Sequence, residues 1–187
     1  APEQIARRGI TRTFQNIQLF KFMSVLDNVK IGCHINTKTG MLDAMLHTKR
    51  YRRDEKFAVE RSLEILNDIG MYEVRDTMAG TLPYGMQRKV EIARALALKP
   101  KLLLLDEPAA GMNPLETHSL MEFIKLLNRK DYSILVIEHD MKFVMNACNR
   151  ILVINFGQRI AEGTPEEIRN NQLVREAYFG KGLVVEG

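Results

Sequence analysis

The hydrophobic pattern of the chain is organised around Leu102–Leu105, four consecutive leucines that are followed directly by Asp106 and Glu107 and then by Pro108. A continuous apolar run has neither a helical face nor an alternating one, so it predicts a strand buried on both faces of a parallel sheet. Pro108 ends the strand because proline cannot continue a sheet ladder. The two carboxylates are therefore predicted at the carboxyl end of a strand, where open α/β sheets bind ligands. An ordinary core strand with a polar loop is the alternative.

Helical and strand patterns alternate along the rest of the chain. Apolar residues at helical spacing predict helices, with Ser24, Asn113 and Thr164 as N-terminal caps and Gly70 as a C-terminal cap. Short alternating or apolar runs predict strands. The predicted helices begin near 24 and 164 and cover 56–69, 86–98, 114–129 and 172–179; the predicted strands are 10–14, 102–105 and 133–137, with a hairpin of 150–154 and 158–161.

The order of these elements predicts an α/β fold with a mostly parallel sheet. Residues 101–137 form a β-α-β unit, so Glu107 and the segment 138–140 are expected at the same edge of the sheet. The region of about 36–80 shows no strand signal, and residues of about 24–98 are predicted to form a helical subdomain. The remaining residues, 1–23 and 99–187, would supply the sheet core and the C-terminal helices of the same single domain.

The predicted helix at 86–98 carries an apolar stripe, and its charged residues are expected to face away from that stripe. These charged residues are Arg88, Lys89, Glu91 and Arg94. Gly85 lies where this helix begins, and the free backbone N–H groups of a helix N-terminus attract phosphate.

Composition excludes several classes of protein. The chain has 187 residues, of which 45% are hydrophobic and 27% charged, and no apolar run approaches the roughly 18 residues of a membrane-spanning helix. Cys33 and Cys148 are far apart and are expected to be reduced thiols of a cytosolic protein, without zinc or a disulfide. The net charge of +4 is mild, and the basic cluster at 49–53 is read as a solvated helix start, so no nucleic-acid partner is expected. The first residues show no secretory signal.

Five segments in order resemble the ATP-binding subunits of ABC transporters. They are Gln15 (Q-loop position), 82–87 running into the following helix (signature), 102–107 (Walker B strand), 110–113 (D-loop position) and His139 (switch-histidine position). The spellings Leu-Pro-Tyr-Gly-Met-Gln-Arg, Glu-Pro-Ala-Ala-Gly-Met-Asn-Pro and Ile-Glu-His-Asp-Met are similar to the branched-chain amino-acid importer ATPases of the LivG type. The resemblance implies a P-loop-NTPase-like fold with a RecA-like core that is incomplete in this chain.

The resemblance also implies roles for individual residues, with ATP and Mg²⁺ as cofactors. Asp106 would hold Mg²⁺, assisted by the Gln15 carbonyl, as hard oxygen ligands do beside phosphates. Glu107 would be the general base for the attacking water, and His139 would contact the γ-phosphate. The implied nucleotide-binding residues are Gln15, Leu82, Pro83, Tyr84, Gly85, Met86, Gln87, Asp106, Ala110, Gly111, Met112 and Asn113.

Partners follow from the same resemblance. The signature helix would face a nucleotide held by a second ATP-binding subunit, so a homodimer or heterodimer with two composite sites is expected. The helical subdomain would contact transmembrane permease subunits, which places the protein in the cytoplasm, peripheral on the inner face of the plasma membrane. Phe14, Phe20 and Phe22 are candidate contacts to that partner, although core packing is the favoured role for each of them.

The printed chain departs from the family at the phosphate loop, which requires Gly-x-x-x-x-Gly-Lys-[Ser/Thr]. Gly80 and Gly85 have the glycine spacing, but Met86 stands where the lysine is needed. We expect an N-terminally incomplete ATPase domain that by itself binds ATP weakly or not at all. Pro83 and Met86 also replace the signature serine and glutamine, and Asn113 replaces the D-loop aspartate. The backbone amides near Gly85 are expected to remain available.

The sequence thus favours a transport ATPase that couples hydrolysis to an amino-acid importer. Two alternatives from other classes stay open. One is a non-catalytic interaction module that docks on a membrane partner or complements another ATPase. The other is an ABC ATPase of another transport or non-transport system, such as DNA repair or translation.

Overall fold

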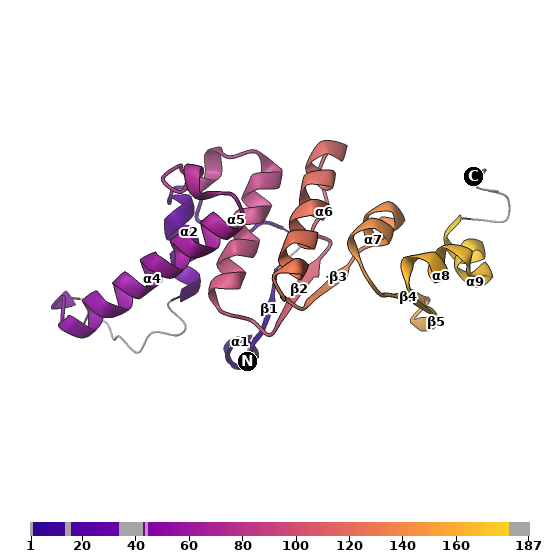
Figure 1. Ribbon diagram of the computed structural model, residues 1–187, viewed down its shortest axis with the longest axis horizontal. Coiled ribbons are helices and arrows are strands. Elements are labelled where there is room, and N and C mark those ends of the chain that lie inside the picture. Colours follow the sequence, from indigo (N-terminus) through magenta and orange to yellow (C-terminus); the bar gives the residue numbers. More distant parts are fainter. Residues whose placement is uncertain (1, 14–15, 34–42, 44, 180–187) are drawn as a thin grey trace. The chain divides into compact units, whose positions relative to one another are not determined.

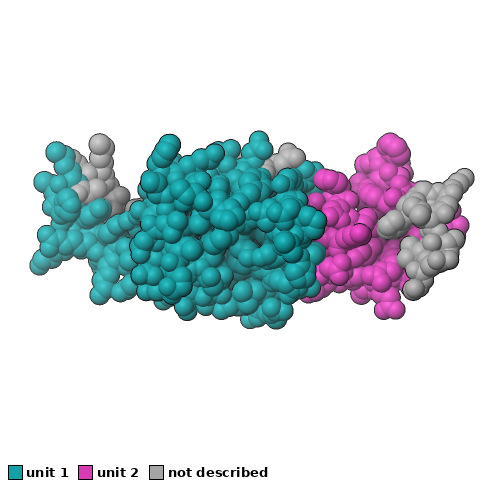
Figure 2. Space-filling model, turned by 90° about the horizontal axis from the view of Figure 1, so that it is seen from above, with its two compact units in different colours: residues 1–137 teal, residues 138–187 magenta. Residues whose placement is uncertain are grey.

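The structure is a computed structural model that describes all residues except 1, 14–15, 34–42, 44 and 180–187 (Figure 1). The chain forms two compact units, residues 1–137 and 138–187, which Figure 2 colours separately and which are described one at a time. Gln15 and Phe14 lie outside the described residues. The division into a sheet core and a helical subdomain of about 24–98 stays a prediction.

A parallel sheet of three strands lies in the first unit, in the order β1 (Ile10–Arg12), β2 (Leu102–Asp106) and β3 (Ile134–Ile137). The register pairs Arg12 with Leu104 and Asp106 with Ile137. This confirms the parallel sheet. The expectation of burial on both faces of β2 is wrong, because Leu103 and Leu105 are buried whereas Leu102 and Leu104 are half-buried. Side chains alternate across a strand, and only one face of β2 is fully covered in the described unit.

Helices make up most of the first unit. They are α1 (Pro2–Arg7), α2 (Val25–Cys33), α4 (Lys49–Asp68), α5 (Tyr84–Ala97) and α6 (Pro114–Arg129), with short 3₁₀ turns η2 (Tyr72–Val74) and η3 (Ala79–Thr81). Helix α4 begins earlier than the predicted 56, because Thr48 acts as its cap and accepts a hydrogen bond from the Tyr51 amide at 3.2 Å. Helix α1 was not predicted.

The predicted caps are confirmed. The Ser24 hydroxyl accepts from the Asp27 amide at 3.0 Å at the start of α2. Asn113 and Glu116 form a reciprocal capping box at the start of α6. Gly70 follows α4 with a positive φ of 69°, the left-handed conformation that favours glycine after a helix.

Helix α5 packs against α2, α4 and α6 and is therefore covered on several sides. Val90, Ile92 and Ala93 are fully buried, which confirms an apolar core along the helix. The expectation that its charged residues face away from the core is wrong for two of them: Arg88 is 0% exposed and Glu91 is 3% exposed. These side chains are buried because α5 is enclosed by its neighbours instead of lying on the surface.

Helices α2 and α5 lie very close together at Gly32. A Cβ atom built on Gly32 would lie 2.2 Å from the Arg94 carbonyl oxygen and 2.9 Å from the Ala97 Cβ. Both distances are below any that real Cβ atoms show, and the nearer atom belongs to the backbone of α5. Glycine is therefore required for this helix contact.

We expect Gly32→Ala to destabilise the chain by at least about 1–3 kcal/mol, the usual cost of overpacking. Alanine's better helix propensity returns only about 1 kcal/mol or less, so the clash dominates. Chemical denaturation measures the difference. Asn67→Ala, on the exposed side of α4, is the control and should change stability by no more than about 0.5 kcal/mol. A Gly32→Ala chain as stable as this control would contradict the close approach.

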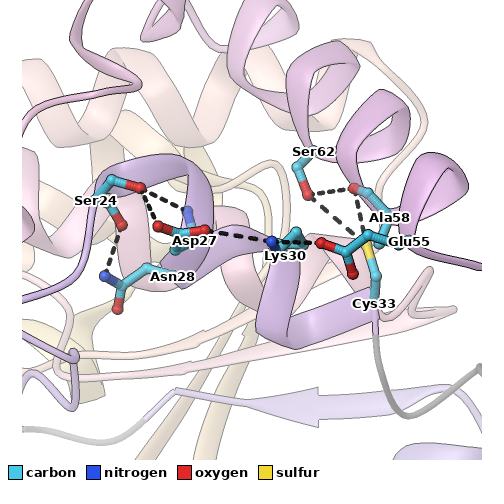
Figure 3. A network of polar contacts seen from close by, with 8 residues as sticks. All are labelled: Ser24, Asp27, Asn28, Lys30, Cys33, Glu55, Ala58 and Ser62. Atoms are coloured by element: carbon cyan, nitrogen blue, oxygen red, sulfur yellow. Dashed lines mark hydrogen bonds and ion pairs between the residues drawn. The ribbon is translucent and has the colours of Figure 1, made fainter. Parts of the chain in front are cut away.

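A polar network joins α2 to α4 (Figure 3). The Lys30 Nζ atom lies 2.7 Å from Glu55 and 3.4 Å from Asp27. Burial opposes the charged form of Lys30, but hydrogen bonds and attraction from Glu55 and Asp27 outweigh it and raise the pKa. Cys33 is buried, with its Sγ 3.8 Å from the Ser62 hydroxyl, and burial raises its pKa. The thiol is therefore protonated at neutral pH, and Cys33 and Cys148 are both free cysteines.

The second unit contains α7 (Met141–Ala147), a hairpin of β4 (Ile151–Asn155) and β5 (Gln158–Gly163), α8 (Pro165–Asn170), α9 (Gln172–Val174) and the π-helical turn η4 (Arg175–Phe179). The antiparallel hairpin and the Thr164 cap are confirmed. Helix α7, capped by Asp140, was not predicted. This unit has its own apolar core of Ile151, Val153, Ala161, Ile168 and Val174.

Among the described helices, none is both long and apolar enough to cross a bilayer.

Candidate functional site

The candidate Mg²⁺ ligand Asp106 and the candidate general base Glu107 lie at the carboxyl end of β2, as predicted. Asp106 is the last strand residue and pairs with Ile137. The Glu107 amide continues the ladder by donating to the Ile137 carbonyl at 2.9 Å. Glu107 nevertheless has a positive φ of 42°. A left-handed backbone at a non-glycine residue costs about 1–3 kcal/mol, and such strain concentrates at functional sites.

Asp106 has a partner that sequence reasoning missed. An Arg12 Nη atom, from the end of the neighbouring strand β1, lies 2.5 Å from an Asp106 carboxylate oxygen. The arginine side chain is 55% exposed and the aspartate 24%, so the pair sits at the surface of the sheet edge. The only sequence signal was a basic residue near the end of a predicted strand, which does not reveal its neighbour.

The chemistry of this edge fits Mg²⁺. Mg²⁺ is held by one or two carboxylates together with phosphates and waters instead of an all-protein cage. Asp106, with its hard oxygen atoms, suits that mode. Among the residues that the structure describes, no group of three or more His, Cys, Asp and Glu side chains lies close enough together to hold a metal ion.

The segment 110–113 forms a turn that leads into α6. Gly111 has a positive φ of 76°, and the Met112 amide donates to the Ala109 carbonyl at 3.1 Å. The Asn113 side chain accepts from the Glu116 amide at 3.0 Å, which fixes the start of α6. The asparagine that stands at the D-loop aspartate position is thus a helix cap.

The segment 82–87 forms the start of α5. Pro83 is the N-cap residue, and its carbonyl accepts from the Met86 and Gln87 amides, both at 3.0 Å. The Gln87 side chain donates to the Leu82 carbonyl at 2.8 Å. Tyr84 is exposed and Gly85 is buried. The signature residues are therefore brought together at a helix N-terminus, as predicted.

Glu116 connects the starts of α5 and α6. One of its carboxylate oxygens accepts from the Gly85 amide at 3.1 Å, and the other accepts from the Asn113 amide at 3.2 Å. The expectation that the amides near Gly85 remain available is therefore wrong for Gly85 itself. The carboxylate occupies it because α6 packs directly against α5. In the sequence, Glu116 is recognisable only as an acidic residue three positions after the predicted cap Asn113.

A second contact between α5 and α6 lies about one helical turn further on. The Lys89 ammonium donates to the Ser119 hydroxyl at 2.8 Å and lies 5.5 Å from the centre of the Phe123 ring. Burial lowers the pKa of Lys89. Together with Glu116, these contacts hold the signature and D-loop segments in one arrangement.

His139 belongs to the second unit, two residues beyond the end of β3. Its backbone amide donates to the Glu138 side chain at 3.2 Å, and its own side chain is largely exposed. Glu138 and Asp140 flank it, and Asp140 caps α7. The role of His139 towards a phosphate stays a prediction, as do the roles of the other site residues.

Comparisons with known proteins agree with the fold. The profile of the family described as ABC transporter matches residues 1–110, and that of the branched-chain amino acid ATP-binding cassette transporter matches 158–183. The chain is 47% identical over 180 residues to the high-affinity branched-chain amino acid transport ATP-binding protein LivG of Escherichia coli (strain K12), covering 96% of this chain and 71% of LivG. It is 45% identical over 179 residues to BraF of Pseudomonas aeruginosa, covering 95% and 70%.

Solved structures give the same result. The crystal structure of the ADP conformation of MJ1267, an ATP-binding cassette of an ABC transporter, superposes with a TM-score of 0.76 at 34% identity, covering 96% of this chain and 72% of that one. A nucleotide-free cassette superposes with a TM-score of 0.74 at 36% identity, with coverage of 96% and 72%. These structures are cassettes of the same α/β type as the fold described above. The chain belongs to the ABC transporter family, among its ATP-binding proteins.

Proposed function

We propose that this chain is the energy-coupling subunit of a branched-chain amino-acid importer and uses Mg²⁺-ATP. The observation that carries the proposal is the pair Asp106–Glu107 at the carboxyl end of a parallel strand. The names of the LivG and BraF relatives support the substrate class.

In this proposal each residue of the strand end has one task. Asp106 holds Mg²⁺, which offsets the charge of the nucleotide phosphates. Glu107 orients or deprotonates the attacking water and thereby acts as general base. The strained backbone of Glu107 supports this role, because it fixes the direction of the side chain relative to the sheet edge.

We further propose that the starts of α5 and α6 face a second ATP-binding subunit. Glu116 holds these two starts together, so the signature and D-loop segments can meet a partner as one surface. A homodimer and a heterodimer both satisfy this arrangement.

Transmembrane permease subunits are the other proposed partner, which would place the protein peripherally on the inner face of the plasma membrane. Phe22 is 94% exposed and Phe20 51% exposed. Core packing is therefore wrong as their role, and exposed aromatic rings suit a protein interface. Phe14 lies outside the described residues.

A chimera tests the proposed function. The 180 matched residues of E. coli LivG are replaced by this chain, and the remainder of LivG is kept. We expect the chimera to support uptake of radiolabelled leucine in a strain that lacks LivG, because the sheet edge and the exposed aromatic residues are then joined to a complete importer.

The control is the same chimera with Phe22→Ser, which should fold, as judged by circular dichroism, but support less uptake. ATP hydrolysis without any amino-acid uptake by the folded parent chimera would contradict the importer assignment and favour another ABC system. A folded chimera that neither hydrolyses ATP nor supports uptake would favour a non-catalytic module.

A further inference from the structure

Helix α5 contains a buried ion pair that the proposed mechanism does not use. An Arg88 Nη atom lies 2.7 Å from one Glu91 carboxylate oxygen, and the two side chains are 0% and 3% exposed. Buried ion pairs usually contribute little net stability, because removing both charges from water offsets their attraction. A gain in the stability of the fold alone therefore does not explain why this ion pair is buried.

The second carboxylate oxygen of Glu91 binds a different segment of the chain. It accepts a hydrogen bond from the Gln18 backbone amide at 3.1 Å. Gln18 belongs to the segment 16–23, which follows Gln15 in the chain. The carboxylate thus has one oxygen on Arg88 of its own helix and the other on a segment 73 positions away.

The segment 16–23 has further attachments to helical elements of the first unit. Asn28 of α2, which is fully buried, accepts from the Phe20 amide at 2.9 Å and donates to the Phe20 carbonyl at 3.0 Å. The Gly80 amide donates to the Lys21 carbonyl at 2.9 Å, just before the signature residues. A Cβ on Gly80 would lie 2.8 Å from Lys21 atoms, so the two backbones meet closely.

On its other side the same part of the chain leads back to the sheet. The Thr13 amide donates to the Leu104 carbonyl of β2 at 2.9 Å. Only four residues, one of which is Gln15, separate Thr13 from Gln18 in the chain. Among the described residues, the hydrogen bond from Gln18 to Glu91 is therefore the first hydrogen bond to a helix after the predicted Q-loop residue.

We propose that Glu91 is a positioning residue that fixes the segment 16–23 to the signature helix α5, with Arg88 holding the Glu91 carboxylate in place. A shift of this segment is then transmitted to α5 and to Gly85 at its start. The functional meaning of this link rests on the proposed ATPase function, whereas the link itself does not.

Amide hydrogen exchange of the 187-residue chain, followed residue by residue by NMR, tests the link. The double variant Arg88→Met with Glu91→Leu removes both charges and keeps side-chain volume. We expect the Gln18 amide to exchange about 10-fold faster or more, since a hydrogen bond to a charged group is lost. The Phe20 amide, held by Asn28, should exchange at its original rate. A merely structural role would accelerate both amides together.

The matched control is Glu122→Leu with Lys125→Met, an ion pair of the same spacing that is exposed on α6; it should leave Gln18 exchange unchanged. If the double variant does not fold, Glu91→Gln serves, and a smaller acceleration at Gln18 alone is expected. Unchanged Gln18 exchange, or equal acceleration at Gln18 and Phe20, overturns the proposal. Failure of the LivG chimera to support uptake bears on the proposed function and leaves this result intact.

Discussion

Glu107→Gln in the LivG chimera should lower steady-state ATP hydrolysis by about 10²- to 10⁴-fold, the part of the rate that a positioned general base supplies. Glutamine keeps the size and the backbone requirement of glutamate at this left-handed position, so the change removes only the capacity to take a proton. ATP binding should persist, because the nucleotide phosphates are expected to be held by other groups. Hydrolysis is measured as phosphate release, and binding by titration with a fluorescent ATP analogue.

The matched control for that variant is Glu122→Gln, on the exposed side of α6, which should keep the parent rate. Phosphate release by the Glu107→Gln chimera at the rate of this control would remove Glu107 from the base role. Simultaneous loss of hydrolysis and binding would instead assign it to nucleotide binding.

Arg88→Met should destabilise the chain by about 3–5 kcal/mol, because it leaves the Glu91 carboxylate buried without its ion-pair partner. The double variant with Glu91→Leu should regain most of that loss, since removing both charges also removes the cost of desolvating them. Guanidinium denaturation followed by circular dichroism measures the stabilities of the parent, of Arg88→Met, of Glu91→Leu and of the double variant. The coupling between the two positions then follows from the double-mutant cycle of these four proteins.

Lys125→Met is the comparison for that cycle, because Lys125 and Glu122 have the same three-residue spacing but lie at the surface. Exposed pairs contribute about 0–1 kcal/mol, so this variant should be close to the parent. An equal, small loss in Arg88→Met and Lys125→Met would show that the Glu91 charge is solvated and not buried.

Local signals in the sequence account for the parts of the fold that were predicted. The caps at Ser24, Asn113 and Thr164 depend on hydrogen bonds within three residues, so their spacing is visible in the chain itself. The parallel pairing of β2 and β3 follows from an apolar run, a helix and a second apolar run. Short helices such as α1 and α7 contain too few turns for a periodic pattern to stand out.

The polar contacts that organise the candidate site could not be predicted in this way. Arg12 and Asp106 are 94 positions apart, and Gly85 and Glu116 are 31 apart. Their meeting depends on which helices and strands become neighbours, and one sequence contains no information on such pairs. The burial of Arg88 and Glu91 was missed for the same reason, because charge predicts exposure unless the surroundings of the helix are known.

The contact between Gly85 and Glu116 limits how this part of the protein can vary. A Cβ on Gly85 would lie 3.2 Å from the Cβ and Cγ atoms of Glu116, whose carboxylate caps one helix and supports the start of another. A larger residue at 85 therefore disturbs two helix starts through one displaced side chain. Residues 85 and 116 therefore have to be varied together. Substitutions made at one of these positions at a time do not separate the effect of either residue from that of its neighbour.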